Sequence, residues 1–469
     1  MNRLSFRSQK RSGPLLSLIR KAHADMASYM LNPHNRLYAV MILIFLAGNL
    51  FQAVNRFAII DGSDLNGYLE SAVAAKYLDV DVYEVYRNNS FSAFFYVVML
   101  FFSLFATWLG SLLWAMANVV FYLWSIVVFN EILFRTQPGR EKLNVFVAPI
   151  LTFALFATNI HMGQSNHIIL VCMLISLYYL HRNAHVKSSL FLAFAIAYKL
   201  TPAFLVFYLL LKRKFRTALY TVMFTLLFLI VVPMFFYNPK KSIDYLASWS
   251  NLVIEPFFSG QKVQTTNTGY YHTNQSLDAF LNRHFTPYGT ERYGGAHHVV
   301  DFPFLSEAGA HRAGVVIKLI IIAILALVAL KNRTIDSRLF PFEFSLFLIA
   351  ILFISPSSWP SHYILILPSY ILVVNEIIIL PKGRHGRNLL TWSLGLGTAI
   401  MLLGWGPYLQ SFSFYFIGIF IFFIGLLIYT LFFAGKAERF EGSDPGRHWL
   451  GRSGPVVKQH AQKEPTNTL

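Results

Sequence analysis

The chain has 469 residues, of which 55% are hydrophobic and only 13% are charged, about half the charged share of a soluble domain. This composition excludes a soluble multidomain enzyme and a disordered chain, and the single cysteine excludes an internal disulfide and hence a disulfide-stapled secreted scaffold. The basic residues behind the net charge of +17 lie between apolar runs rather than in one domain, which argues against nucleic acid as a partner and favours a lipid bilayer.

The N-terminal residues 1–36 are polar and basic, and we expect them to form a cytoplasmic leader. A helix needs roughly 20 apolar residues to cross a bilayer, so residues 37–434 are predicted to form an all-α polytopic membrane domain. The polar residues 435–469 are predicted to form a disordered cytoplasmic tail. The apolar runs, in chain order, are Leu37–Phe57, Phe91–Thr107, Gly110–Leu133, Val145–Ile160, His167–Leu180, Ser188–Leu211, Ala218–Tyr237, Ala313–Leu330, Phe340–Ile354, Tyr363–Leu380, Leu389–Trp405 and Phe412–Phe433.

The connectors between these runs differ in charge. Connectors rich in Lys and Arg are expected in the cytoplasm, as are both termini. The other connectors are expected outside, including two long outer loops at residues 58–90 and 238–312. The connectors rich in Lys and Arg, which the positive-inside rule assigns to the cytoplasm, are Arg135–Lys142, Arg182–Lys187, Lys212–Arg216, Lys331–Arg338, Lys382–Arg387 and the tail from Lys436.

Two apolar runs cannot each be a single crossing helix if the connectors alternate between the two sides of the membrane. Phe91–Thr107 is expected to form an outer-surface or partly inserted helix, because it and Gly110–Leu133 together cross only once. Ser188–Leu211 begins and ends at basic connectors, and Pro202 disfavours helix at the residue before it. We therefore expect two short helices joined by a polar tip at Lys199–Pro202, which gives about 12 membrane helices in total.

Unusual polar clusters all fall on the predicted outer side. Asp61 and Asp64 follow the first run, where an acid could cap a helix or act as a general base. The turn from His161 to His167, with Gln164 and Asn166, is either a simple capped loop or a site for hydroxyl and phosphate groups. Lys199 lies in an apolar run, where it either snorkels to water or meets a phosphate.

Two further clusters lie later in the chain. Asn274, Gln275 and Arg283 belong to the second outer loop, and Trp359 and His362 to a stiff outer turn. Trp359 is explained by interfacial anchoring, whereas His362 could touch a ligand. The histidines of the second loop lack metal-ligand spacing, so no metal is expected. Phosphate-binding, zinc-protease and hydrolase motifs are missing from the sequence, so neither direct use of a nucleotide nor a cofactor is expected.

Five of these motifs occur in the order known from one family. Asp64-Leu65-Asn66-Gly67-Tyr68, Gly163–Asn166, Lys199–Pro202, Asn274–Leu277 and Ser355–Trp359 together resemble glycosyltransferase family 87, the polytopic bacterial mannosyltransferases of the type C glycosyltransferase superfamily. The motifs span residues 61–362. Two departures stand out: Leu65 replaces a common Phe, and Pro360-Ser361-His362 replaces an acid followed by two histidines.

The resemblance implies a type C glycosyltransferase-like fold in the bacterial cytoplasmic membrane, with its active site facing the periplasm. It implies transfer of a hexosyl group, in the first place mannosyl, from a polyprenyl-phosphate donor to a glycolipid or glycan acceptor. Asp64 or Asp61 would be the catalytic base. The substrate-binding residues would be His161, Gln164, Asn166, Lys199, Asn274, Gln275, Arg283, Trp359 and His362. The alternative is a multi-pass lipid or sugar transporter or flippase, for which we would expect repeats and ionisable residues at mid-membrane.

Overall fold

The computed structural model describes residues 47–52, 55, 64–78, 80–85, 91–136, 147–255, 272–286, 305–332, 334–335 and 337–435. The predicted leader, most of the first apolar run and nearly all of the predicted tail lie outside these residues. Every regular element in the described part of the chain is a helix. The prediction of an all-α membrane protein is therefore confirmed.

Five helical segments are long and apolar enough to cross a membrane. The count of about 12 membrane helices stays a prediction, since these five are all that the described residues provide at full crossing length. The segments are Thr107–Leu133 within α6 (Thr107–Thr136), Phe215–Phe236, which joins α12 (Phe215–Leu226), η2 (Leu227–Val231) and α13 (Val232–Phe236), α17 (Glu307–Lys331), Pro360–Ile379, which joins η5 (Pro360–Ile366) and α19 (Leu367–Ile379), and α22 (Phe414–Phe432).

The other apolar runs form shorter helices. The run at Phe91–Thr107 becomes α5 (Ala93–Ser103), whose 11 residues reach roughly 16 Å, about half of the hydrocarbon core of a bilayer. This length agrees with the expectation that the run does not cross by itself. The remaining short apolar helices are α7 (Val147–Leu151), α8 (Phe153–His161), α9 (Asn166–His181) and α18 (Phe340–Ile354), while α20 (His385–Leu403) has 19 residues.

The run at Ser188–Leu211 is broken at the predicted position. Helix α10 (His185–Tyr198) ends before Lys199, and a short helix η1 (Thr201–Ala203) with Pro202 leads into α11 (Phe204–Leu211). Lys199 itself has an extended backbone, with φ −149° and ψ 129°. The two short helices therefore meet at a non-helical residue whose side chain is free to leave the helix surface.

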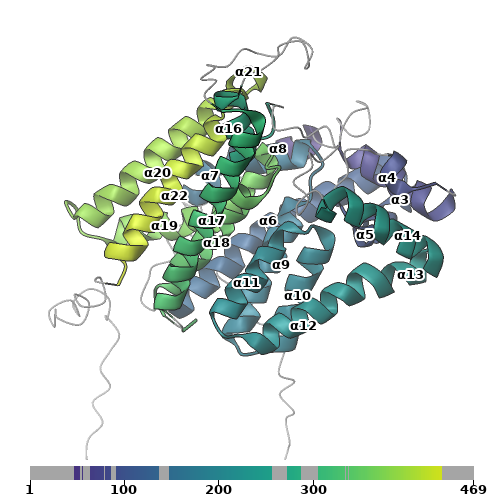
Figure 1. Ribbon diagram of the computed structural model, residues 1–469, viewed down its shortest axis with the longest axis horizontal. Coiled ribbons are helices and arrows are strands. Elements are labelled where there is room, and N and C mark those ends of the chain that lie inside the picture. Colours follow the sequence, from purple (N-terminus) through teal and green to yellow (C-terminus); the bar gives the residue numbers. More distant parts are fainter. Residues whose placement is uncertain are drawn as a thin grey trace, which may run out of the picture.

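The expected outer loops contain helices of their own. These are α3 (Asp64–Tyr77), α4 (Val82–Val85), α14 (Pro239–Trp249), η3 (Ser250–Ile254) and α16 (Leu277–Phe285), and the short α21 (Pro407–Gln410) lies in a later outer connector. Tyr245 of α14 donates a hydrogen bond to the carbonyl of Val80 at 3.0 Å, and Ser248 donates one to Asp81 at 2.6 Å. The first loop is thereby fixed to the start of the second, and Figure 1 shows α3, α4, α13 and α14 together at one end of the molecule.

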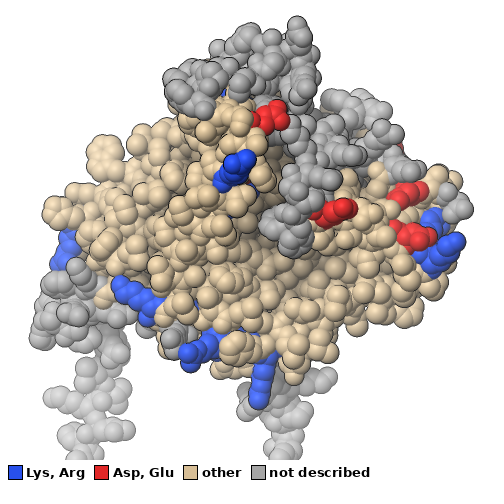
Figure 2. All heavy atoms as spheres, viewed as in Figure 1, with Lys and Arg blue, Asp and Glu red and all other residues tan. Residues whose placement is uncertain are grey.

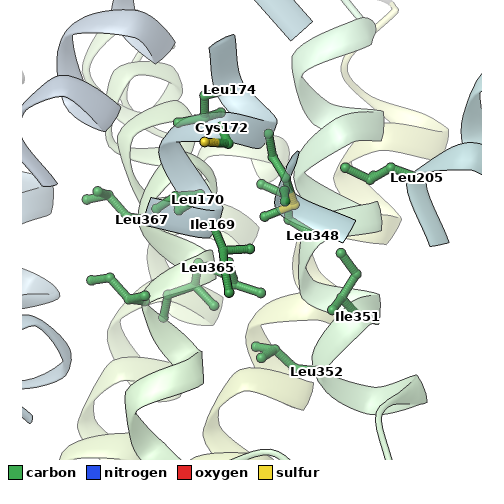
Figure 3. Packing of buried hydrophobic residues seen from close by; sticks show 14 of the residues in the cluster. Ile169, Leu170, Cys172, Leu174, Leu205, Leu348, Ile351, Leu352, Leu365 and Leu367 are labelled. Atoms are coloured by element: carbon green, nitrogen blue, oxygen red, sulfur yellow. The ribbon is translucent and has the colours of Figure 1, made fainter. Parts of the chain in front are cut away.

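Helix α9 lies in the centre of the core. All of its residues from Asn166 to Leu180 are buried, and it packs against α6, α10 and η5. Figure 3 shows Ile169 and Leu170 among Leu348 and Leu365 of the neighbouring segments. A helix that is apolar all round has no face for solvent, so it is stable only when other helices surround it.

The surface of the molecule has an apolar belt and separate charged edges. The segment Phe215–Phe236 is largely exposed, with large side chains such as Leu219, Met223 and Phe235 on its surface. Figure 2 shows most Lys and Arg side chains along the lower ends of the helices, with the acidic side chains above them. Exposed apolar side chains of this extent fit lipid contact, and the charge separation distinguishes two faces.

Helices α20 and α22 pack through glycines at very short range. A Cβ atom on Gly418 would lie 2.4 Å from the carbonyl oxygen of Gly397, and a Cβ atom on Gly397 would lie 2.7 Å from that of Gly418. Farther along, a Cβ atom on Gly425 would lie 2.2 Å from Cβ of Ser393. Small residues at such positions let membrane helices approach with their backbones in contact.

This packing predicts opposite effects for two glycine-to-alanine substitutions. Gly418→Ala should lower the thermal unfolding midpoint in detergent, because overpacking against backbone costs about 1–3 kcal/mol. Gly395→Ala, in α20 with open space around its Cβ position, should leave the midpoint unchanged or raise it, because alanine favours helix by about 0.5–1 kcal/mol over glycine. Equal effects of the two substitutions would contradict the close packing.

Candidate functional site

The first part of the site is the beginning of α3. Asp64 is the first residue of this helix and is half-buried, while Leu65 and Tyr68 are buried. The side-chain Nε2 of Gln164 donates hydrogen bonds to Oδ2 of Asp64 and, at 3.1 Å, to the hydroxyl oxygen of Tyr68. Positions four residues apart share a helix face, so Asp64 and Tyr68 both reach the same amide. A carboxylate at the first turn of a helix is also favoured by the helix dipole.

The second part is the turn between α8 and α9, which carries Gln164. Gly163 has φ +69°, and a Cβ atom there would lie 2.5 Å from Cβ of Leu65 and 3.0 Å from its backbone nitrogen. The carbonyl of Gly163 accepts a hydrogen bond from Nε1 of Trp114 at 3.0 Å. Glycine is needed here both for the left-handed backbone and for the direct contact with α3.

The third part is Lys199, at the break between α10 and η1. Its ammonium nitrogen lies 2.8 Å from Nε2 of His362 and 3.3 Å from Oδ1 of Asn166, and it stands 5.4 Å from the centre of the Phe91 ring. The residue is only 8% exposed. Lys199 is therefore held by polar and aromatic partners inside the protein and does not snorkel to water.

Burial and a nearby acid act on Lys199 in opposite directions. Lys199 lies in the connector rather than in a membrane-crossing helix, and burial lowers the pKa of its ammonium group to about 7, while the charge of Asp64 acts to raise it. Asp64 is thus an electrostatic neighbour of Lys199 although the two are far apart in sequence. An additional anion beside Lys199 would stabilise its charged form further.

A cluster of aromatic rings lies next to these groups. Phe91 and Phe95 stack with ring centres 4.0 Å apart, and Tyr68 and Tyr198 meet Phe95 edge to face at 5.0 Å and 4.9 Å. All four side chains are buried. The sequence predictions gave these four residues no function, although the spacing of four residues between Asp64 and Tyr68 could have indicated a shared helix face. Phe91, Phe95 and Tyr198 gave no such signal, because aromatic residues are abundant throughout this chain.

Asn274, Gln275 and Arg283 form a separate group, whose described side-chain hydrogen bonds go to backbone groups and to Ser413. Asn274 accepts hydrogen bonds from the backbone nitrogens of Ser276 and Ser358 at 3.1 Å. Gln275 donates to the carbonyl of Gln410 at 2.8 Å. Arg283 donates to the carbonyl of Asn274 and to the hydroxyl of Ser413, both at 2.6 Å. We call this group the loop clamp.

The loop clamp is joined to the turn that carries His362. The hydroxyl of Tyr363 donates to the carbonyl of Gln275 at 2.6 Å, and the backbone nitrogen of Gln275 donates to the carbonyl of Ser358 at 2.7 Å. The backbone nitrogen of Trp359 in turn donates to Nδ1 of His362 at 3.2 Å. The second outer loop therefore fixes the position of His362 beside Lys199 without its own side chains reaching the lysine in any described contact.

The other predicted site residues lie at helix ends or outside the described residues. His161 is half-buried at the end of α8, and Trp359 is half-buried at the start of η5. Asp61, the alternative base, and the second-loop histidines His297 and His298 lie outside the described residues. Within the described part of the chain, no three His, Cys, Asp or Glu side chains come together in a group that could hold a metal ion.

The arrangement combines two functions that group transfer needs. A half-buried carboxylate, Asp64, can take a proton from a hydroxyl group. A buried cation beside it, Lys199, can stabilise an anion that develops or departs in the reaction, and it does so more strongly where water is excluded. Both groups are fixed by side chains from other segments, mainly Gln164, Asn166 and His362.

Comparison with known proteins assigns the chain to a family. A model of glycosyltransferase family 87 matches residues 91–356, more than half of the chain. The match includes the turn at Gly163, Lys199 and the loop clamp, whereas Asp64 precedes it and His362 follows it. No curated protein and no solved structure matches the chain. The resemblance found in the sequence is thereby confirmed, and this membrane protein is a glycosyltransferase that belongs to glycosyltransferase family 87.

Proposed function

We propose that the protein transfers a hexosyl group, in the first place mannosyl, from a polyprenyl-phosphate donor to a glycolipid or glycan acceptor. The reaction takes place at the outer face of the bacterial cytoplasmic membrane. The observation that carries this proposal is the position of Lys199, a buried cation beside the acid Asp64 in a protein with an apolar, lipid-compatible surface. A phosphate on a lipid tail fits both the cation and the setting.

The proposed reaction is a single displacement. Asp64 takes the proton from the acceptor hydroxyl, and the acceptor oxygen forms a bond to the anomeric carbon of the sugar. The bond between that carbon and the phosphate oxygen breaks, and polyprenyl phosphate leaves with the bonding electrons. Lys199 stabilises the negative charge of the leaving group. The phosphate needs no proton near neutral pH, so one carboxylate suffices, unlike the carboxylate pair of a glycoside hydrolase.

The remaining site residues support this division of roles. Asn166 and His362 contact Lys199 directly, so we propose that they hold it toward the donor phosphate. His161 and Trp359, at the ends of the two neighbouring turns, are proposed to contact the sugar or the acceptor. Asn274, Gln275 and Arg283 are proposed to act indirectly, because the loop clamp fixes the turn that carries His362.

The outer location rests on the distribution of charge. Most of the Lys and Arg side chains visible in Figure 2 lie along the lower ends of the helices, and the positive-inside rule assigns that end to the cytoplasm. The basic connector Arg182–Lys187 joins α9 to α10. The turn at Gly163 and the break at Lys199 lie at the other ends of these two helices. With this orientation the active site faces the periplasm and both termini lie in the cytoplasm.

The function is tested by direct assay of sugar transfer. Purified protein is incubated with polyprenyl-phosphate mannose and a glycolipid fraction, and release of polyprenyl phosphate is followed together with mannose in the product. We expect both to appear in equal amounts. Polyprenyl-phosphate glucose and GDP-mannose serve as competing donors. Transfer from GDP-mannose alone would contradict the lipid-linked donor, and preference for the glucosyl lipid would correct the sugar.

Replacement of the proposed base should reduce turnover. Asp64→Asn keeps the shape of the side chain but cannot accept the proton, so kcat should fall about 10²- to 10⁴-fold with donor binding retained. Glu70→Gln, an exposed acid on the same helix, is the matched control and should have normal turnover. Asn caps a helix about as well as Asp, so normal turnover of Asp64→Asn would support the capping role, and a simultaneous loss in Asp61→Asn would transfer the base role to Asp61.

Replacement of Lys199 should act on the donor. Lys199→Met keeps the length of the side chain and removes the charge, and we expect weaker binding of polyprenyl phosphate and slower release of the leaving group. A charge-assisted hydrogen bond contributes about 1.5–3 kcal/mol, which corresponds to roughly a 10- to 150-fold change in Kd. Lys187→Met, an exposed lysine of α10, is the control. Unchanged donor affinity in Lys199→Met would exclude the phosphate contact.

A further inference from the structure

The amide of Gln164 is directed at α3. Its nitrogen carries two hydrogens, and the two bonds that it donates go to Oδ2 of Asp64 and to the hydroxyl of Tyr68. The side chain is 7% exposed. Both N–H groups are thus occupied inside the protein, which leaves neither of them for a sugar hydroxyl while these contacts hold.

The backbone that carries this amide is fixed independently. The nitrogen of Gln164 donates to the carbonyl of Asn159 at 2.9 Å, and the carbonyl of Gly163 accepts from Trp114 of α6 at 3.0 Å. A Cβ atom on Gly163 would lie 3.0 Å from the backbone nitrogen of Leu65, the residue that follows Asp64, so the turn packs closely against α3. A continuous series of contacts therefore runs from α6 through the turn to the Asp64 carboxylate.

We propose that Gln164 is a positioning residue that orients the Asp64 carboxylate for proton transfer. The proposal rests on the function proposed above, in which Asp64 is the base. One carboxylate oxygen bound to a rigid amide sets the rotation of the group relative to Lys199 and to the acceptor hydroxyl. The same hydrogen bond favours the ionised carboxylate, which is the form that accepts a proton. Gln164 itself touches no reacting atom.

Two titratable side chains act on Asp64 or share its amide partner in the described part of the chain. Lys199, on the connector after α10, acts on it electrostatically, and Tyr68, on its own helix, shares the Gln164 amide. His362, on η5, contacts Lys199 directly. A change at Gln164 therefore alters a neutral hydrogen-bond partner of the carboxylate while Lys199 and His362 stay in place.

The test uses two substitutions of Gln164 in the full-length protein and compares kcat and KM over a range of pH. Gln164→Glu places a second carboxyl group against Asp64, and two carboxyl groups at one site favour a shared proton. The low-pH limb of the kcat profile should move upward by about one pH unit or more, and kcat at the optimum should fall about 10- to 100-fold. KM for the lipid donor should stay within about twofold, because the donor is held by Lys199.

Gln164→Met is the second substitution and keeps the volume without a hydrogen bond. It should lower kcat and move the same limb in the same direction by a smaller amount, and it keeps the test valid if Gln164→Glu does not fold. A raised donor KM with an unmoved limb would show that Gln164 contacts the sugar and would overturn the proposal. A lowered unfolding midpoint with normal kcat and an unmoved limb would show a purely structural role and would overturn it as well.

Failure of the function proposed above gives a different result. If Asp64→Asn retains normal turnover, then the base has been misassigned whatever the Gln164 substitutions do. If Asp64→Asn is inactive and both Gln164 variants have wild-type profiles, then Asp64 keeps its role and only the positioning role of Gln164 is excluded.

Discussion

The structure of the site depends on the need to keep one ammonium group charged inside an apolar protein. A buried lysine without partners loses its proton or destabilises the fold. Lys199 has Asn166, His362, the face of Phe91 and the charge of Asp64 around it. These partners come from α9, η5, the segment just before α5, and α3. The same requirement thus brings four separate parts of the chain to one point.

Interrupted helices make this convergence possible. A continuous helix directs its side chains outward at fixed intervals and offers no polar backbone in the membrane. The break after α10 frees Lys199, the turn after α8 presents Gln164, and η5 begins at the turn that presents His362. Irregular backbone in such a protein is tolerated where other segments cover it, and the aromatic cluster and the loop clamp provide that cover here.

Part of this arrangement followed from the sequence. Pro202 located the break at Lys199, and a lysine in an apolar run indicated a counter-group, because both effects are local. Charge alternation along the chain predicted one outer side for all the polar motifs, and the structure brings Gln164 to Asp64 and His362 to Lys199. The partner of Asp64 could not be predicted, since Gln164 is 100 residues away and no local pattern links an amide to a distant carboxylate.

The role of the second outer loop was also beyond the sequence. Asn, Gln and Arg side chains bind sugars and buried carbonyl groups equally well, and only the fold distinguishes these uses. Gln275 and Asn274 are 0% exposed, which identifies them as internal bracing. Nothing in the sequence indicated that Trp114 supports the site. Its ring N–H donates to the carbonyl of Gly163, 49 residues away, and no local pattern predicts such a contact.

The loop clamp limits which segments can be exchanged between this protein and its relatives in a chimera. Its hydrogen bonds join Asn274 to backbone at Pro356 and Ser358, and Arg283 to Ser413 in the connector before α22. The loop is therefore not an independent module, although it looks like an insertion in the sequence. A chimera that imports this loop from a relative, for instance to change acceptor choice, needs the matching turn and connector from the same parent. Loop, turn and connector therefore have to be exchanged together.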